Sequence, residues 1–193
     1  MTQKKWFIPV AIIGAIFIVG FMFVGWANGV YDTAVSLQED TDAQWGNVQG
    51  AYQRRADLVP QLVATVKGAA ENENKILTEV TQARAGIVNA KTPEDMDLMG
   101  KKINTAINLA FEAYPEIKST QNFRDLQAQL EGTENRIAVE RRRYNETAKM
   151  FNKHIRGIFR GFALRMFGDD DEFEKKEMFK ASAGAENAPT VEF

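Results

Sequence analysis

An uncharged, apolar run stands near the start of the chain. Residues 7–27 comprise 21 positions without a charged side chain. At ~1.5 Å of rise per residue, a helix of this length crosses a hydrocarbon core of about 30 Å. Trp6 and Trp26 flank the run and lie 20 residues apart, which would put both indoles at headgroup depth. We therefore predict a transmembrane helix over residues 7–27, after a short flank of residues 1–6. Its membrane-anchoring residues are Trp6, Phe7, Trp26 and Ala27.

The residues around this run favour a permanent anchor over a cleaved signal peptide. The apolar stretch is longer than the usual ~7–15 residues, and Gly25-Trp26-Ala27 is a poor cleavage site. Lys4 and Lys5 precede the run, whereas the first Lys or Arg after it is Arg54. Because positive charge resists translocation, we expect a cytoplasmic N-terminus and an extracytoplasmic remainder.

Beyond the anchor, apolar and small residues recur at alternating spacings of three and four, which indicates the seam of a helical bundle. Thr92-Pro93-Glu94-Asp95 has the composition of a helix start, and Pro115 disfavours helix at Tyr114. The pattern predicts an all-α protein in which the transmembrane helix is followed by an elongated antiparallel bundle over residues 28–167. The expected helices span residues 30–68, 73–90, 93–114 and 122–160.

The course of the chain between residues 30 and 90 allows two topologies. One continuous helix would give three long helices, but at ~90 Å it would project far beyond its partners. A break between Gly68 and Asn74, where residues typical of helix ends and starts cluster, gives four helices of matched lengths. We favour four.

Composition removes several functional classes. Lys and Arg total 24 against 26 Asp and Glu, so no basic field points to nucleic acid. Without cysteine the chain has no disulfide, thiol nucleophile or thiolate-bound metal. The single histidine, His154, lies near the end of the last long helix, where we expect it to be solvated.

Charged residues on the helices are interpreted as structural. Arg55 occupies a seam position, and antiparallel packing would bring Glu131 and Glu134 opposite it. We predict a structural ion pair among these three, because an unpaired buried charge costs several kcal/mol. Glu71 and Glu73 have no neighbouring base or cation and are expected to be solvated. No catalytic residue, metal site or cofactor site is predicted.

A cationic and apolar stretch occupies residues 153–167 and contains no acid. Its cations could meet lipid phosphates while its aromatic side chains enter the membrane interface, or the stretch could simply close the fold. The expected interface contacts are Lys153, Arg156, Arg160, Phe162, Arg165 and Phe167. Residues 168–193 follow as an acidic, mostly disordered tail.

The last residues, Val191, Glu192 and Phe193, suggest a second kind of partner. A terminal carboxylate after an aromatic residue can add a strand to a PDZ-type module, whose backbone amides hold the carboxylate. The alternative is an unbound, disordered end.

Two long motifs resemble the signatures of the LemA family. The first motif covers residues 54–63 and 65–68, and the second covers 130–138, 142–145 and 151–152. Tyr114-Pro115, residues 184–186 and residues 189–193 also fit that family. The resemblance implies a membrane-anchored, extended helical bundle, widespread in bacteria, and it carries no cofactor or catalytic residue onto this chain. Between Gly157 and Asp171 the chain has more Arg, and then more acid, than the family leads one to expect.

These observations predict a non-enzymatic scaffold that self-associates at the bacterial inner membrane. Its expected partners are copies of itself, membrane lipids and an envelope PDZ-type protein. The alternative is an adaptor for envelope proteolysis or stress signalling that presents Phe193. A hydrolase built on Glu71, Glu73, Glu131 and Glu134 is the least favoured hypothesis.

Overall fold

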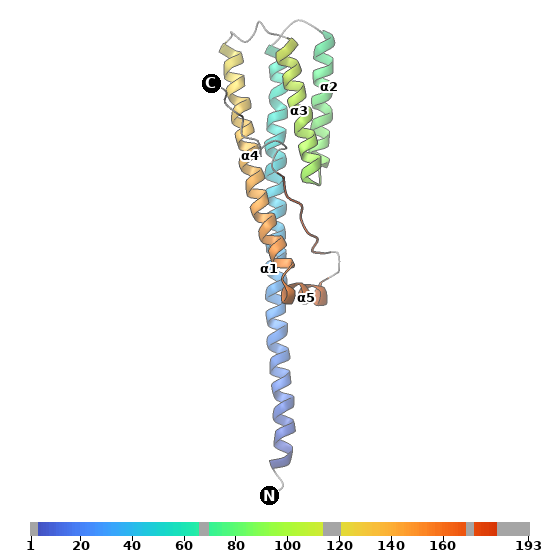
Figure 1. Ribbon diagram of the computed structural model, residues 1–193, viewed down its shortest axis with the longest axis vertical. Coiled ribbons are helices and arrows are strands. Elements are labelled where there is room, and N and C mark those ends of the chain that lie inside the picture. The colour runs from blue at the N-terminus through green and yellow to red at the C-terminus, as the bar shows by residue number, and fades with distance from the viewer. Residues whose placement is uncertain (1–3, 66–69, 114–120, 169–171, 181–193) are drawn as a thin grey trace, which may run out of the picture. The chain divides into compact units, whose positions relative to one another are not determined.

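The computed structural model describes residues 4–65, 70–113, 121–168 and 172–180, and these residues form five α-helices and no strand (Figure 1). The predicted all-α class is therefore confirmed. The helices are α1 (Lys4–Thr65), α2 (Ala70–Asn89), α3 (Pro93–Ala113), α4 (Gln121–Ile155) and α5 (Ile158–Phe167). The chain divides into two compact units, with boundaries between residues 41 and 42, 147 and 148, and 176 and 177.

α1 and α2 are separate helices, and their facing ends each lie three residues earlier than the ends expected at residues 68 and 73. α1 ends at Thr65 and α2 begins at Ala70, with the residues between them outside the described ranges. α1 also differs from expectation, because the apolar run and the first bundle helix form one continuous helix. No proline separates them, and a single helical glycine such as Gly29 costs only about 1 kcal/mol.

One unit contains a four-helix bundle, made of α1 from residue 42, α2, α3 and α4 up to residue 147, together with the described residues 177–180. In α1, Gln44 bonds Glu140 and Arg55 pairs with Glu134, so residue numbers rise in α1 as they fall in α4 and the two helices are antiparallel. The predicted seam is its core. Among the buried side chains are Val48, Tyr52, Val59, Leu62, Ile76, Val80, Ile87, Met96, Ile103, Leu130 and Ile137.

Two helix ends in the bundle are capped by side chains. Thr92 accepts a hydrogen bond from the Asp95 amide at 3.1 Å, and Asp95 accepts one from the Thr92 amide at 3.2 Å. This reciprocal box starts α3 where the sequence predicted it. At the end of α2, Trp45 donates to the carbonyl of Ala90 and Gln49 to that of Ile87, which satisfies carbonyls that a helix end leaves free.

The other unit contains α1 up to residue 41, α4 from residue 148, α5 and residues 172–176. The expected helix over 122–160 is split here, because Gly157 is extended (φ −66°, ψ 133°) between α4 and α5. A Cβ atom at Gly161 would lie 2.9 Å from the carbonyl oxygen of Ile155. The close approach of α5 to the end of α4 therefore requires a glycine at position 161.

Candidate membrane interface

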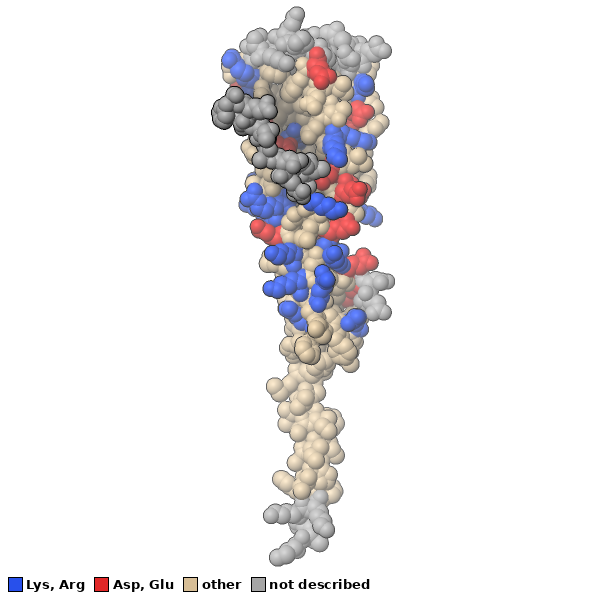
Figure 2. Space-filling model, in the orientation of Figure 1, with Lys and Arg blue, Asp and Glu red and all other residues tan. Residues whose placement is uncertain are grey.

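The N-terminal part of α1 presents an uncovered apolar surface. Among the described residues, α1 is the one helix long and apolar enough to cross a membrane, and its most apolar window is not buried by protein. Trp6 and Phe7 are exposed, as are most apolar side chains up to Trp26. Residues 7–27 have no charged side chain, and on the face drawn in Figure 2 the described atoms of this part of the molecule are tan. Such a surface is stable when an apolar medium covers it.

Helix α5 packs on α1 immediately after this run. Ala163 and Leu164 of α5 are buried against three α1 residues, Ala27, Val30 and Ala34. The small side chains of Ala27 and Ala34 let α5 approach α1 closely. The ring of Phe167 also lies 6.5 Å from that of Phe23, between centroids. The end of the apolar run is thereby the surface to which α5 is fixed.

The opposite face of α5 is apolar and uncovered. Ile158, Phe159 and Phe162 are 86%, 78% and 55% exposed, and Met166 is also exposed. One helix therefore has a buried stripe that closes the unit and an exposed stripe that protein leaves free. The buried face fits the fold-closing interpretation of this segment, and the interface interpretation concerns the exposed face.

The cations predicted for an interface lie around this helix. Lys153, Arg156 and Arg165 are exposed, and Arg160 is partly buried. From residue 149 to residue 168 the chain has five Lys or Arg and no acid. The structure thus brings the predicted basic and aromatic residues into one unit with the end of the apolar run.

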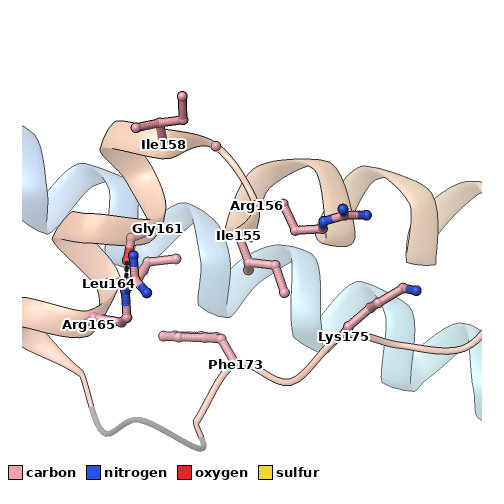
Figure 3. A pocket seen from close by; sticks show the side chains of 9 residues that line it. Ile155, Arg156, Ile158, Gly161, Leu164, Arg165, Phe173 and Lys175 are labelled. Carbon is pink, nitrogen blue, oxygen red and sulfur yellow. Dashed lines mark hydrogen bonds between the residues drawn. The ribbon is translucent and has the colours of Figure 1, made fainter.

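A pocket of about 560 Å³ opens beside α5 (Figure 3). Its apolar lining includes Ile155, Ile158, Leu164 and Phe173. Its cationic lining consists of Arg156, Arg165 and Lys175. Leu164 belongs to the cluster that packs on α1, so the pocket lies next to the end of the apolar run.

Several polar residues that hold this unit together were not foreseen. His154, expected to be solvated, is buried, and its Nε2 lies 2.9 Å from the carbonyl oxygen of Val30. Asn152 accepts a hydrogen bond from the amide of Lys176 and donates one to the carbonyl of the same residue. Tyr31 donates to the carboxylate of Glu172. The residues just after position 171 therefore contact helices, whereas the sequence assigned them to a mostly disordered tail.

In the bundle unit, the predicted ion pair forms in part. Arg55 pairs with Glu134, and its guanidinium also donates to Asn104 at 2.9 Å and to the carbonyl of Leu130 at 3.3 Å. Glu131 is exposed and accepts a hydrogen bond from Gln127 instead. Arg55 thus links α1, α3 and α4, which is a structural role.

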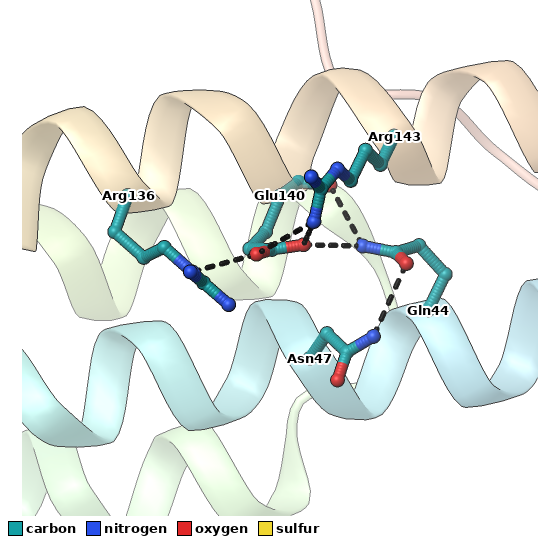
Figure 4. Close-up of polar contacts among 5 residues, drawn as sticks. All are labelled: Gln44, Asn47, Arg136, Glu140 and Arg143. Carbon is teal, nitrogen blue, oxygen red and sulfur yellow. Dashed lines mark hydrogen bonds and ion pairs between the residues drawn. The ribbon is translucent and has the colours of Figure 1, made fainter.

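A second polar cluster surrounds Glu140, a residue that sequence reasoning missed (Figure 4). Its side chain is 1% exposed, accepts a hydrogen bond from Gln44 at 2.8 Å and forms ion pairs with Arg136 at 2.7 Å and Arg143 at 3.3 Å. Burial alone would raise the pKa of Glu140. The hydrogen bond from Gln44 and the charges of Arg136 and Arg143 outweigh burial and lower that pKa. With its acid ionised and fully paired, the cluster fixes helix register.

Two further points concern metal ions and the end of the chain. Within the described part of the chain, no group of three or more His, Asp or Glu side chains is placed to hold a metal ion. The proposed partner-binding residues Val191, Glu192 and Phe193 lie outside the described residues.

Comparison with known proteins connects these features to one family. The model of the LemA family matches residues 44–193. Protein LemA of Metamycoplasma hominis is 26% identical over 156 residues, covering 79% of this chain and 69% of that protein. Magnetosome proteins MamQ 1 and MamQ 2 of Paramagnetospirillum magneticum are each 26% identical over 154 residues, covering 65% of this chain. The match spans only 57% of either magnetosome protein.

Proposed function

Because the chain belongs to the LemA family, we propose that it acts as a membrane-anchored, non-enzymatic scaffold that self-associates at the bacterial inner membrane. In this proposal the apolar part of α1 spans the bilayer and α5 lies in the adjoining interface. The bundle is extracytoplasmic and presents its helices to partners.

The observation that carries the proposal is the division of α5 into two faces. Ala163 and Leu164 attach the helix to α1, while Phe159 and Phe162 point away from the protein core. An exposed aromatic face next to an apolar helix, with cations on both sides, is typical of interfacial helices. Full burial of such a side chain in an apolar medium is worth about 1.5–3 kcal/mol, and partial insertion into the interface gains a share of that free energy.

Self-association is supported by the surface of α1 itself. Gly25 and Gly29 lie four residues apart, and outside the local helix backbone no atom lies within 4 Å of where a Cβ would stand at either position. Small residues with this spacing let a second membrane helix approach closely. A second copy of α1 is the partner we propose.

The position of α5 is tested by fluorescence quenching in bilayers. Because the chain has no cysteine, Phe162→Cys can be labelled with an environment-sensitive dye in full-length protein reconstituted into vesicles. We expect strong quenching by lipids that carry a shallow spin label. Leu98→Cys in α3, an exposed apolar residue of the bundle unit, is the matched control and should remain unquenched. Equal quenching at the two positions contradicts the proposal.

Self-association needs a separate measurement. Gly25→Leu should weaken dimers detected by crosslinking in membranes, whereas Gly14→Leu, on the same helix with equal open space, should leave them intact. Strictly monomeric wild-type protein in membranes would exclude the scaffold proposed here.

Labelling of Lys101→Cys, on an exposed bundle position, by an impermeant thiol reagent in intact cells tests the orientation.

A further inference from the structure

The pocket beside α5 joins an apolar wall to a cluster of cations. Its three charged lining residues, Arg156, Arg165 and Lys175, are all basic. From this arrangement we propose that the pocket binds the phosphate headgroup of an anionic phospholipid, an inference that rests on the proposed membrane location.

The charges at this pocket are available to a ligand. Among the described residues, none of the three cations forms an ion pair, and Arg165 uses its Nε to donate to the carbonyl of Gly161 at 3.2 Å. The two Nη groups of Arg165 are then left for an anion, and a guanidinium can hold phosphate with two parallel hydrogen bonds. The carboxylate of the nearby Glu172 is already bonded to Tyr31. The described lining therefore favours a negative ligand.

The distribution of the lining residues suits a lipid better than a free ion. In Figure 3, Arg165 lies at one side of the pocket, and Arg156 and Lys175 lie at the other, with Ile155 and Phe173 between them. Inorganic phosphate would gain nothing from the apolar side chains. A phospholipid places phosphate oxygens among cations and glycerol and acyl carbons against the apolar wall in the same binding event.

The location of the pocket fits this occupant. Leu164 lines the pocket and also packs in the cluster that contains Ala27 and Val30, directly after the apolar run of α1. If that run crosses the bilayer, its end lies at the depth of lipid phosphates. The exposed Ile158 at the pocket lining would then face acyl chains. A lipid can reach the site by lateral diffusion, without leaving the membrane.

The test is lipid retention by the full-length protein. Detergent-purified protein is mixed with phosphatidylglycerol, cardiolipin or phosphatidylcholine, and bound lipid is counted by native mass spectrometry. We expect the protein to retain one molecule of phosphatidylglycerol or cardiolipin, at least tenfold better than phosphatidylcholine. Because each cation contributes roughly a fivefold gain in affinity for anionic lipid, Arg156→Gln/Arg165→Gln/Lys175→Gln should lose roughly 100-fold.

A charge-matched control separates a site from general attraction. Lys91→Gln/Lys101→Gln/Arg124→Gln removes three exposed cations of the bundle unit that neither line the pocket nor belong to the expected interface, and it should retain the lipid within about threefold of wild type. Arg156→Lys/Arg165→Lys keeps the charge and should retain the lipid to within about tenfold, which excludes misfolding as the cause of a loss. Equal loss in the two triple variants, or no loss in either, overturns the site.

Two further measurements show whether the bound phosphate belongs to a lipid, and whether a negative result concerns membrane anchoring or the lipid site. Millimolar inorganic phosphate should not displace the lipid, and displacement would overturn the lipid assignment in favour of free phosphate. All variants should stay in the membrane fraction after alkaline extraction. Wild-type protein released by that extraction would contradict the proposed function itself, whereas retained protein without lipid selectivity contradicts only this site.

Discussion

Asn145 and Phe179 pair through two hydrogen bonds, as neighbouring residues in a β-sheet do. The side-chain Oδ1 of Asn145 accepts from the Phe179 amide at 2.8 Å, and its Nδ2 donates to the Phe179 carbonyl at 2.9 Å. Asn152 forms the same two hydrogen bonds with the amide and the carbonyl of Lys176. Asn145 and Asn152 are seven residues apart in a helix, and Lys176 and Phe179 are three residues apart in extended chain. Both separations are about 10 Å, so the two pairs can form together.

We expect Asn145→Ala to free the backbone of Phe179. The buried amide and carbonyl would lose their partners, at about 1–3 kcal/mol for an unsatisfied buried group. Hydrogen exchange of the Phe179 amide should accelerate roughly tenfold or more, while that of α3 is unchanged. Asn108→Ala, at an exposed position of α3, is the control. Unaltered exchange at Phe179 would show that Trp45 and Arg141, which contact its ring, hold the segment by themselves.

The Glu140 cluster predicts a pH dependence of stability. The pKa of Glu140 is lowered in the folded state, so its contribution is fully present above the ordinary glutamate pKa of about 4.3. That contribution is lost as pH falls through the lowered pKa. Glu140→Gln should therefore reduce the free energy of unfolding by about 1–2 kcal/mol at pH 7 and by progressively less below pH ~4.

Chemical denaturation of both proteins between pH 7 and pH 3 measures this difference. Glu131→Gln, an exposed acid of the same helix, is the charge-matched control and should change stability by less than about 0.5 kcal/mol. If the difference in the free energy of unfolding between wild type and Glu140→Gln grows as the pH falls, the prediction is wrong.

Two glycines in helix interiors should respond in opposite directions to alanine. At Gly100 in α3 a Cβ atom would lie 2.7 Å from Cε1 of the buried Tyr52, so Gly100→Ala should destabilise the bundle by about 1–3 kcal/mol. At Gly132 in α4 nothing lies within 4 Å, and Gly132→Ala should stabilise by about 0.5–1 kcal/mol. Urea denaturation checks both values, and a stabilised Gly100→Ala would refute the packing of Tyr52 on α3.

The Arg55–Glu134 pair can be measured by a double-mutant cycle. Arg55 is 12% exposed but Glu134 is 58% exposed, so solvent screens the pair and its coupling should be only about 1 kcal/mol. Arg55→Met should cost more than Glu134→Gln, because it also removes hydrogen bonds to Asn104 and Leu130. Equal effects of the two single variants would place the role of Arg55 in the ion pair alone.

The helices and their order could be read from the sequence because they depend on local chemistry. Apolar residues recur every three or four positions from Val48 to Leu62 and from Ile76 to Ile87, and this spacing marks the buried stripe whichever partner covers it. Thr92 and Asp95 lie within one turn of each other, so their capping box needs no distant residue. The uncharged run of α1 is likewise a property of consecutive positions.

Contacts between distant parts of the chain could be read only in part. The seam position of Arg55 pointed to a partner in the last helix, but Glu131 and Glu134 differ by three residues, and rotation of α4 decides which one it meets. Glu140 has the same composition cues as any exposed helical acid. Its burial follows from Gln44 lying opposite, 96 positions away.

Two features depend on residues close together in the chain and could therefore be predicted: an apolar helix precedes a helical bundle, and a basic, aromatic stretch follows the last long helix. The turn of this stretch at Gly157 and its packing on Ala27 and Ala34 depend on residues far apart in the chain, so they are visible only in the folded protein. The same holds for the pairing of Asn145 and Asn152 with residues after position 171. Amides, imidazoles and glycines take their roles from whatever lies opposite them, and that is settled by packing.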